Sequence, residues 1–396
     1  MNDTGSSAQR EPTLSVDEAQ HSSRVREHVV AAIAAAGGWL SFERYMDLIL
    51  YAPGLGYYSA GARKLGHGGD FMTAPETSAL FGACVARQCA ELLPRLADAS
   101  IFEIGAGSGA LAADVLERLA DANQLPVRYR ILEISADLRA RQRELLQRRS
   151  PHLLARVEWL DVPPTEPFDG IIVANEVLDA LPVTRFRWTA AGAEELGVVH
   201  EDGCLLWAPR RASAATAAAC AALAAAAGPW DDGYISEYCP RLPAWTAEVT
   251  RSLRTGAVLW FDYGLPRTHY YLPERHEGTL LCHFRHRAES DPFRFPGLQD
   301  VTAWVDFTAL AQAGAAAGFE LAGYTTQTYF LAGAGIDREM QQMAGADANR
   351  FARLANEARQ LMMPGEMGER FKAMAWLRGL DGDLCGFALR DLRHTL

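Results

Sequence analysis

Short apolar runs alternate with helical patterns through the middle of the chain. Five runs predict buried strands, at 100–105, 129–134, 157–160, 168–174 and 256–262. Patterns of helical spacing separate the first three runs, at 109–123 and 136–149. Because strands that alternate with helices form parallel sheets covered on both faces, this part of the chain predicts a doubly wound α/β fold.

The N-terminal region carries a different pattern. Apolar residues at helical spacing predict a helix over 24–36, and Ser41 is the N-cap candidate of a second helix. Thr73 and Glu76 match a capping box, which predicts a helix over 74–93. These elements predict a helical cap in front of the α/β region.

The periodicity changes again after the fourth strand. Three short runs predict an antiparallel patch, at 186–188, 196–199 and 205–207. The alanine-rich stretch 212–227 predicts an exposed helix, because alanine has the highest helix propensity. Residues 264–300 are rich in Pro, His and Arg and predict a long loop. Later elements are expected as helices at 307–317 and 350–362 and as strands at 319–326, 371–378 and 386–390.

Composition narrows the class of protein. The 396 residues include 38 Lys or Arg and 49 Asp or Glu, a formal charge of −11. Such an acidic chain is a poor candidate for general nucleic-acid binding, which needs cations to neutralise phosphates. Seven scattered cysteines without a C-x-x-C spacing predict reduced thiols in a cytoplasmic protein and no metal site. The chain also has no apolar run of the length that crosses a membrane, so membrane insertion is not expected.

The first strand runs into a turn of glycines. Gly105, Ala106, Gly107 and Gly109 follow it and precede a helix, an arrangement that lets the backbone approach a ligand closely. Gly105 and Gly107, with Ala three residues on, also satisfy the dinucleotide-binding fingerprint. Glu103, two residues before the first glycine, makes the segment similar to motif I of class I S-adenosylmethionine methyltransferases. Both interpretations stay open on these residues alone.

Acidic residues end the next two strands. Glu133 is expected to accept hydrogen bonds from ribose hydroxyls, which either kind of fold requires. Methyltransferases usually place a polar contact and an apolar wall for the adenine at the end of the third strand, so Leu160 and Asp161 join the cofactor-binding candidates. Ile134, directly after Glu133, is a further candidate. The alternative is that these acids are solvated charges at strand ends.

A polar segment follows the fourth strand. Asn175, Glu176 and Asp179 come directly after it, at the sheet edge where open α/β sheets bind ligands. A helical turn through Leu181 would place the two carboxylates on one face. Paired carboxylates suit a cationic nucleophile such as a guanidinium. We therefore predict Glu176, Asp179 and Asn175 as catalytic residues, with helix capping as the alternative.

Further motifs extend the resemblance over most of the chain. The blocks Tyr51–Tyr58, Gly69–Glu76, Asn175–Pro182, Phe261–Gly264 and Met367–Phe371 are similar to the MidA family, whose mitochondrial members act in assembly of respiratory complex I. The resemblance implies a cofactor lid, with Asp70, Thr73 and Pro75 at the methionine end of S-adenosyl-L-methionine. It also implies methylation of a protein arginine on the hydrogenase-like subunit of the peripheral arm of complex I.

The patterns along the chain predict an α/β protein, and the resemblance implies a class I methyltransferase (Rossmann-like) core. We expect a mostly parallel seven-stranded sheet, an N-terminal helical cap and inserted helical and antiparallel elements. The expected division is a disordered tail 1–22, a helical cap and cofactor lid 23–95, a cofactor-binding core 96–265 with an insertion at about 183–255, and a region 266–396 with the substrate loop, helices and closing strands.

The predicted function is that of an S-adenosyl-L-methionine-dependent N-methyltransferase. We expect a protein substrate, with an arginine guanidinium favoured and a complex I subunit implied by the resemblance, but neither nucleic acid nor membrane as partner. A homodimer is one arrangement that the sequence leaves open. The alternatives are a non-catalytic assembly chaperone that keeps the cofactor pocket, and an NAD-dependent oxidoreductase.

Overall fold

A large, mostly parallel sheet organises one lobe of the protein. The computed structural model describes residues 14–60, 73–285 and 287–396. Within them, seven strands pair side by side in the order β15 (Glu320–Thr326), β16 (Phe371–Arg378), β10 (Leu253–Leu265), β5 (Phe168–Asn175), β2 (Ser100–Ile104), β3 (Tyr129–Leu132) and β4 (Val157–Leu160). The short β14 (Val305–Asp306) pairs with the end of β10. Only β16 runs antiparallel to its neighbours, so the predicted mostly parallel sheet is confirmed, and β14 brings it to eight strands where seven were expected.

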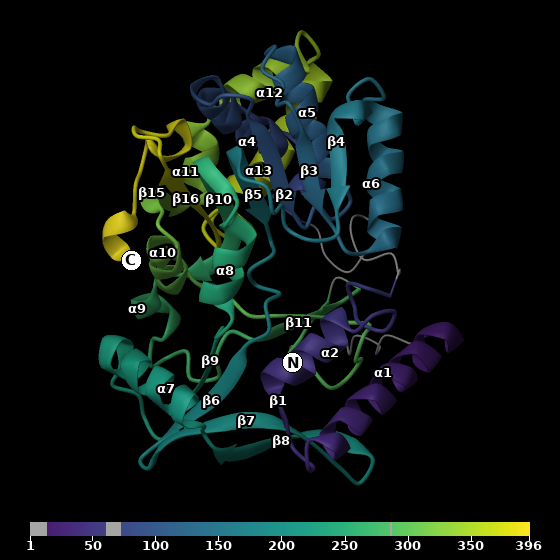
Figure 1. Ribbon diagram of the computed structural model, residues 1–396, viewed down its shortest axis with the longest axis vertical. Coiled ribbons are helices and arrows are strands. Elements are labelled where there is room, and N and C mark those ends of the chain that lie inside the picture. Colours follow the sequence, from purple (N-terminus) through teal and green to yellow (C-terminus); the bar gives the residue numbers. More distant parts are fainter. Residues whose placement is uncertain (1–13, 61–72, 286) are drawn as a thin grey trace, which may run out of the picture.

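Helices cover both faces of this sheet (Figure 1). Alternate residues of one strand, such as Ile101 and Phe102, belong to separate apolar clusters on the two faces. One cluster is covered by α4 (Ala79–Leu92), α5 (Ala110–Asp121), α6 (Ala136–Arg149), α11 (Gln327–Gly333), α12 (Ile336–Ala344) and α13 (Ala348–Met362). The other is covered by α8 (Leu242–Thr250) and α10 (Phe307–Ala316). Burial on both faces explains why these strands are continuous apolar runs.

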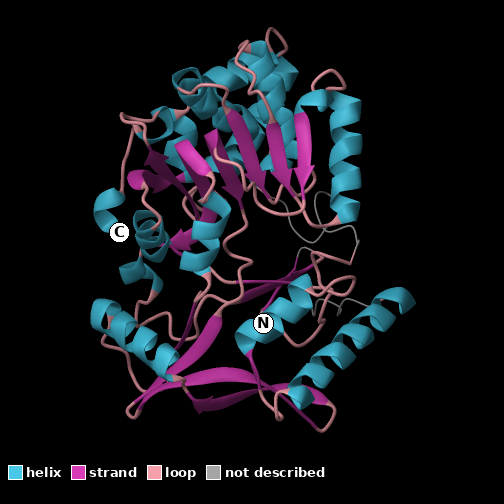
Figure 2. Cartoon of the chain, in the orientation of Figure 1, coloured by secondary structure: helices cyan, strands magenta, loops and turns pink. Residues whose placement is uncertain are grey.

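An antiparallel sheet forms the centre of a second, smaller lobe (Figure 2). It contains β1 (Leu40–Ser41), β6 (Thr184–Thr189), β7 (Gly192–Glu201), β8 (Cys204–Arg211) and β9 (Ile235–Tyr238). The helices α1 (Val16–Ala35), α2 (Phe42–Tyr51) and α7 (Ala214–Ala227) belong to the same lobe. Because β1 pairs with β7, the predicted N-terminal cap and the predicted insertion form one structural unit.

The two lobes therefore do not coincide with the predicted division of the chain. The short helix α3 (Ala74–Thr77) and α4 lie within 23–95, yet α4 packs against α5 in the core of the larger lobe. The predicted loop 264–300 contains α9 (Arg267–Tyr270) and a three-stranded sheet made of β11 (Leu281–Phe284), β12 (Arg287–Glu289) and β13 (Asp300–Thr302). Cys282 and Val301 of that sheet pack into the apolar cluster of the smaller lobe.

Four local predictions are wrong for identifiable reasons. Helix α1 begins at Val16, inside the predicted disordered tail 1–22, because Ser15 and Glu18 form a capping box. The side chain of Thr73 makes no cap hydrogen bond, and an extended Ser78 separates α3 from α4. Residues 386–390 form no strand, since a 3₁₀ turn begins at Cys385. The helical turn expected after β5 is reduced to a single hydrogen-bonded turn, in which the N–H of Leu181 donates to the carbonyl of Leu178 at 3.2 Å. The residues before that turn form a different arrangement, described below.

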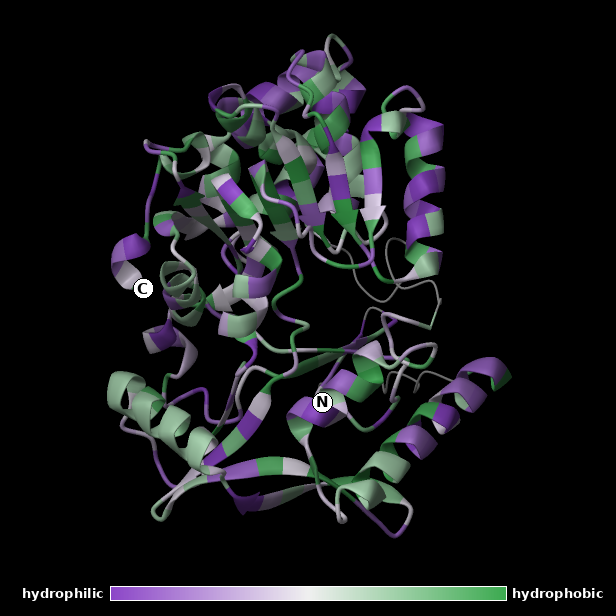
Figure 3. Cartoon of the chain, viewed as in Figure 1, coloured by the Kyte–Doolittle hydropathy of each residue, from purple (hydrophilic) through white to green (hydrophobic). Residues whose placement is uncertain are grey.

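The polarity of the helices matches their positions. Figure 3 shows a largely hydrophilic α6, in which only Gln142 and Leu146 are buried. The alanine-rich α7 forms as predicted and begins at the N-cap Ser213. None of the described helices combines the length and the apolar character that a membrane crossing needs.

Candidate active site between the two lobes

A cavity of about 430 Å³ lies where the order of the main sheet switches direction. Strands β2, β3 and β5 end there, and ligands bind at this edge in open α/β sheets. Residues of the larger lobe line one side, from Glu103 to Ser108 and at Ala110 and Leu111. Asp47, Tyr51 and Tyr58 of the smaller lobe line another side. The cavity is therefore built by both lobes.

The glycine turn provides bare backbone along the cavity. Gly105 and Gly107 line it and have φ values of 68° and 54°, and Gly109, the N-cap of α5, has a φ of 88°. Residues that carry a side chain rarely adopt this region of φ, so the turn requires glycine. An added Cβ would lie 3.1 Å from Val177 at Gly105 and 3.2 Å from Gln142 at Gly109.

Glu103 lies at the end of β2 with its carboxylate buried. The hydroxyl of Tyr129 donates a hydrogen bond to it at 2.8 Å. Burial raises the pKa of Glu103 to about 7, although the Tyr129 bond opposes that shift. The side chain also lines the cavity, so a buried acid stands beside the glycine turn.

Glu133 is held by a network that sequence reasoning did not find. Its carboxylate accepts the backbone N–H of Ser135 at 2.9 Å and the side-chain amide of Gln142 at 3.2 Å. Gln142 also donates to the carbonyl of Gly107 at 2.9 Å and accepts from the indole of Trp159 at 2.9 Å. Gln142 thus fixes Glu133 relative to the glycine turn, and burial raises the pKa of Glu133.

Glu176 faces the same cavity from the end of β5. Its backbone has a φ of 52°, in the left-handed region that glutamate seldom adopts. Its carboxylate accepts the N–H of Ala74 at 3.3 Å and the amide of Asn175 at 3.2 Å. Burial, followed by the charge of Asp179, raises the pKa of Glu176 to about 8. Among the described residues, the buried carbonyl oxygen of the Asn175 side chain has no hydrogen-bond partner.

Asp262 replaces the predicted helical turn with a different arrangement. One oxygen of its carboxylate accepts the N–H groups of Val177, Leu178 and Asp179, at 3.2, 2.9 and 3.3 Å. The side chain of Asp179 accepts a hydrogen bond from Tyr263 and lies behind the loop, outside the cavity lining. Burial raises the pKa of Asp179 to about 6 and that of Asp262 well above its usual range.

The structure brings most of the predicted site residues to one cavity. Those that line it are Thr73, Pro75, Glu103, Gly105, Ala106, Gly107, Glu133, Ile134, Asn175 and Glu176. Gly109, Leu160, Asp161 and Asp179 do not line it. Asp161 is exposed, forms an ion pair with Arg139 and lies outside the cavity lining, so its position at the adenine stays a prediction. Asp70 lies outside the described residues.

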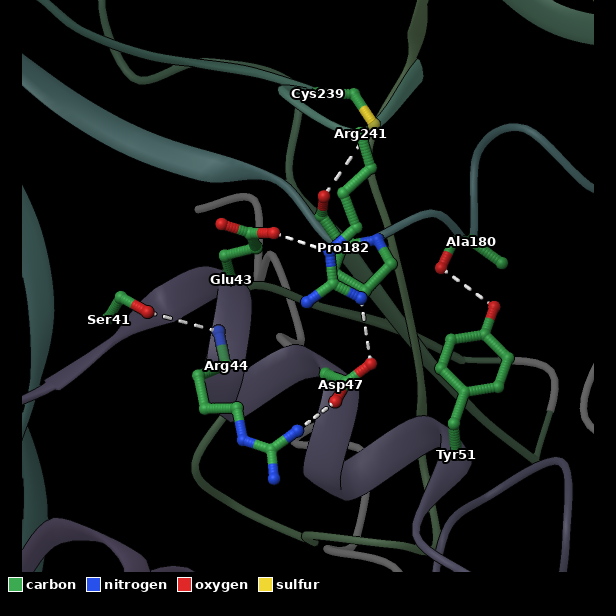
Figure 4. A network of polar contacts seen from close by, with 9 residues as sticks. All are labelled: Ser41, Glu43, Arg44, Asp47, Tyr51, Ala180, Pro182, Cys239 and Arg241. Carbon is green, nitrogen blue, oxygen red and sulfur yellow. Dashed lines mark hydrogen bonds and ion pairs between the residues drawn. The ribbon is translucent and has the colours of Figure 1, made fainter. Parts of the chain in front are cut away.

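Several lining residues were not predicted. They come from α2, from the turn after it and from the start of α8: Asp47, Tyr51, Tyr58, Arg241 and Trp245. Figure 4 shows Arg241 between two carboxylates of α2: it forms ion pairs with Glu43 and with Asp47, the latter at 2.9 Å. Arg241 thereby joins the two lobes at the cavity. Of these residues, only Tyr51 and Tyr58 belong to a motif that the sequence singles out.

The site contains no obvious metal centre. Within the described part of the chain, no group of three or more His, Cys, Asp or Glu side chains is placed to hold a metal ion.

Comparisons with known proteins distinguish between the two interpretations of the glycine turn. A family model described as "Putative S-adenosyl-L-methionine-dependent methyltransferase" matches residues 84–325. A crystal structure from Burkholderia thailandensis, bound to S-adenosyl-homocysteine, has a TM-score of 0.93 and 44% identity, and the match covers 98% of this chain and all of that chain. A native structure from the same organism has a TM-score of 0.90 and 43% identity, with the same coverage.

Curated relatives are similar over nearly the whole chain. The Danio rerio protein named "Protein arginine methyltransferase NDUFAF7, mitochondrial" is 29% identical, over 88% of this chain and 85% of the relative. The Homo sapiens protein of that name is 28% identical, over 88% and 82%. These names contradict the expected cytoplasmic location, which is therefore wrong. The matches also favour a methyltransferase over the NAD-dependent oxidoreductase considered above.

Proposed function

The chain belongs to the family of S-adenosyl-L-methionine-dependent methyltransferases, and from that premise we propose that it methylates an arginine side chain of a protein. Its cofactor is S-adenosyl-L-methionine. The choice of arginine is supported by the relatives, which are named protein arginine methyltransferases and match most of the chain.

The cavity fits the cofactor by the chemistry of its lining. Backbone at Gly105, Ala106 and Gly107 offers the close approach that an extended nucleoside needs, with no side chain larger than the methyl group of Ala106. We assign Glu133 to the ribose hydroxyls, because a carboxylate accepts two hydrogen bonds at once. Ile134 is assigned to the adenine, and Thr73 and Pro75 to the methionine end. Asp70 keeps its predicted role at that end as a proposal.

One observation carries the assignment of the substrate. Glu176 lines the cavity, and no Lys or Arg among the described residues forms an ion pair with it. Even half-buried, a carboxylate without a cationic partner is costly, and it favours a ligand that brings a positive charge. A guanidinium supplies that charge and donates several N–H groups. The carbonyl oxygen of Asn175 is placed to accept one more of them.

The proposed reaction follows from this placement. When bound, the cofactor supplies a methyl group on a positively charged sulfur. Glu176 and Asn175 orient the guanidinium so that one nitrogen faces that methyl group. The nitrogen forms the new N–C bond while the S–C bond breaks, and the nitrogen loses one proton. Glu176 is placed to accept that proton, since its pKa is raised to about 8. Asp179 acts indirectly in this scheme, through its charge on Glu176.

One finer assignment, the acceptor protein, rests on resemblance alone. We propose a subunit of respiratory complex I as the acceptor protein, as in the mitochondrial members of the MidA family. A homodimer stays a prediction, which light scattering on the purified chain tests.

The proposal is tested with the full chain and methyl-labelled cofactor. The protein is incubated with purified complex I that was produced in cells lacking the enzyme, and the acceptor is hydrolysed to amino acids. We expect label in methylarginine. Label found in methyllysine or in nucleic acid would contradict the substrate class. Binding of S-adenosyl-homocysteine without transfer to any component would instead favour the non-catalytic chaperone.

A further inference from the structure

The Tyr51–Tyr58 motif at the end of α2 has no role in the assignments above, although both tyrosines line the cavity. Beyond the end of α2, the chain turns back, and the N–H of Tyr58 donates to the carbonyl of Leu50 at 2.8 Å. Gly56 permits this return, because an added Cβ there would lie 2.5 Å from the carbonyl carbon of Leu50. The turn brings Tyr58 beside Tyr51, although six residues separate them in sequence.

The two tyrosines form a stacked pair in the cavity wall. Their ring centroids are 5.5 Å apart and the ring planes differ by 24°. The hydroxyl of Tyr51 donates to the carbonyl of Ala180 at 2.9 Å, within the loop that follows Glu176. The hydroxyl of Tyr58 donates to both oxygens of Asp300, at 2.9 and 3.0 Å. Because both hydroxyls bond to protein, the pair offers aromatic surface to the cavity.

The charges near this pair favour a cation. Glu176 lines the same cavity, and Asp300 lies close enough for its charge to act on Glu176. Asp300 is only 2% exposed, so water screens its charge weakly. A cation that enters here meets carboxylates and aromatic surface together. A guanidinium is planar and weakly hydrated and stacks on aromatic rings, whereas an ammonium is a compact and strongly hydrated charge.

We propose that Tyr51 and Tyr58 form the wall against which the guanidinium of the substrate lies, and that this wall selects arginine over lysine. The inference rests on the proposed function, since it concerns the same reaction. Asp300 is a positioning residue in this arrangement, because it holds Tyr58 and does not line the cavity.

The wall is tested by separating the ring of Tyr58 from its hydroxyl. In the full chain, Tyr58→Leu is expected to raise KM for the arginine acceptor about tenfold, the loss of a partly desolvated cation–π contact. Tyr58→Phe keeps the ring and is expected to raise KM less than about threefold. Affinity for S-adenosyl-homocysteine, measured by calorimetry, is expected to stay within about twofold in both variants, which shows that they fold.

Tyr329→Leu is the matched control for the loss of a tyrosine ring. Tyr329 lies on α11 outside the cavity lining and stacks on Arg390 of the chain itself, at 4.9 Å. This variant is expected to keep the KM of the parent. An unchanged KM in Tyr58→Leu, or equal losses in Tyr58→Leu and Tyr58→Phe, overturns the wall and leaves the proposed function standing.

A binding experiment separates the two proposals if the parent protein transfers no methyl group to arginine. The protein saturated with S-adenosyl-homocysteine is titrated with N-acetyl-arginine methylamide and with its neutral citrulline counterpart. Tighter binding of the arginine probe, weakened by Tyr58→Leu, supports the wall while the proposed function fails. Equal binding of the two probes, or no effect of Tyr58→Leu, overturns the wall.

Discussion

Replacing Glu176 by glutamine separates the chemistry of the site from its cost in stability. The substitution keeps the size of the side chain and an oxygen that can accept from Ala74 and Asn175. It leaves the backbone φ of 52° as it is, because neither residue is favoured in that region. What it removes is the ionisable group, so changes in transfer and in stability report on that charge.

The stability effect follows from the raised pKa. The ordinary pKa of 4.5 becomes about 8 in the folded chain, so between these values the folded state binds the proton more tightly than the unfolded state does. Stability therefore falls as pH rises through this window, and the full penalty is present above pH 8. Each pKa unit corresponds to about 1.4 kcal/mol, which gives roughly 4 to 5 kcal/mol. Water in the cavity screens part of this, so we expect on the order of 2 kcal/mol.

Thermal unfolding of the cofactor-free protein at a series of pH values measures this penalty. Glu176→Gln is expected to match the parent at pH 5 and to unfold several degrees higher at pH 9, since one kcal/mol shifts Tm by roughly 2 °C in large domains. Affinity for S-adenosyl-homocysteine is expected to stay within a few fold, while methyl transfer falls about a hundredfold or more. Two stability curves that stay parallel from pH 5 to 9 would refute the assigned titration. Unchanged turnover would remove Glu176 from the reaction.

Other substitutions test the remaining parts of the site. Gly107→Val places a branched side chain at a backbone φ of 54° in the proposed cofactor site, so calorimetry is expected to show at least about tenfold weaker binding of S-adenosyl-homocysteine. The control Gly365→Val, with no atom within 4 Å of its added Cβ, is expected to keep the affinity of the parent. Glu133→Gln is expected to weaken that binding about tenfold, and Asp161→Asn, outside the cavity, is expected to leave it unchanged; equal losses would restore Asp161 to the site. Arg241→Met removes a half-exposed double ion pair and is expected to cost about 1 kcal/mol in denaturant unfolding; a loss of several kcal/mol would mean that the pairs are not screened.

The side of the site that we assign to the cofactor could be predicted from the sequence, because it is built from residues close together along the chain. Glu103, the glycine turn and Glu133 lie within 31 consecutive positions and follow neighbouring parallel strands. Strand ends of one sheet meet at one edge, so their order along the chain fixes their proximity. The strands themselves were readable because both of their faces are buried, which leaves uninterrupted apolar runs.

The side that we assign to the substrate could not be predicted, because contacts between segments distant in sequence build it. Tyr58 bonds to Asp300, 242 positions away, and Ala74 bonds to Glu176, 102 positions away. No local spacing encodes such pairs. The prediction of a helical turn after β5 was wrong for the same reason. Asp262, 83 positions beyond Asp179, accepts three successive N–H groups with one oxygen. That acceptor satisfies the backbone without a helix.

Backbone strain marks the same loop independently of any comparison. Among the described non-glycine residues, positive φ values occur at Asp98, Asn123, Glu176, Asp202 and Arg285. Asp and Asn tolerate this region, because their short side chains bond to the local backbone. Glutamate has no such compensation, and Glu176 is the member of this set that lines the cavity. A cost of roughly 1–3 kcal/mol persists only where the surroundings enforce it. Asp262 holds the three N–H groups that follow Glu176, so the fold maintains a strained backbone and a carboxylate of raised pKa at the point where the two lobes meet.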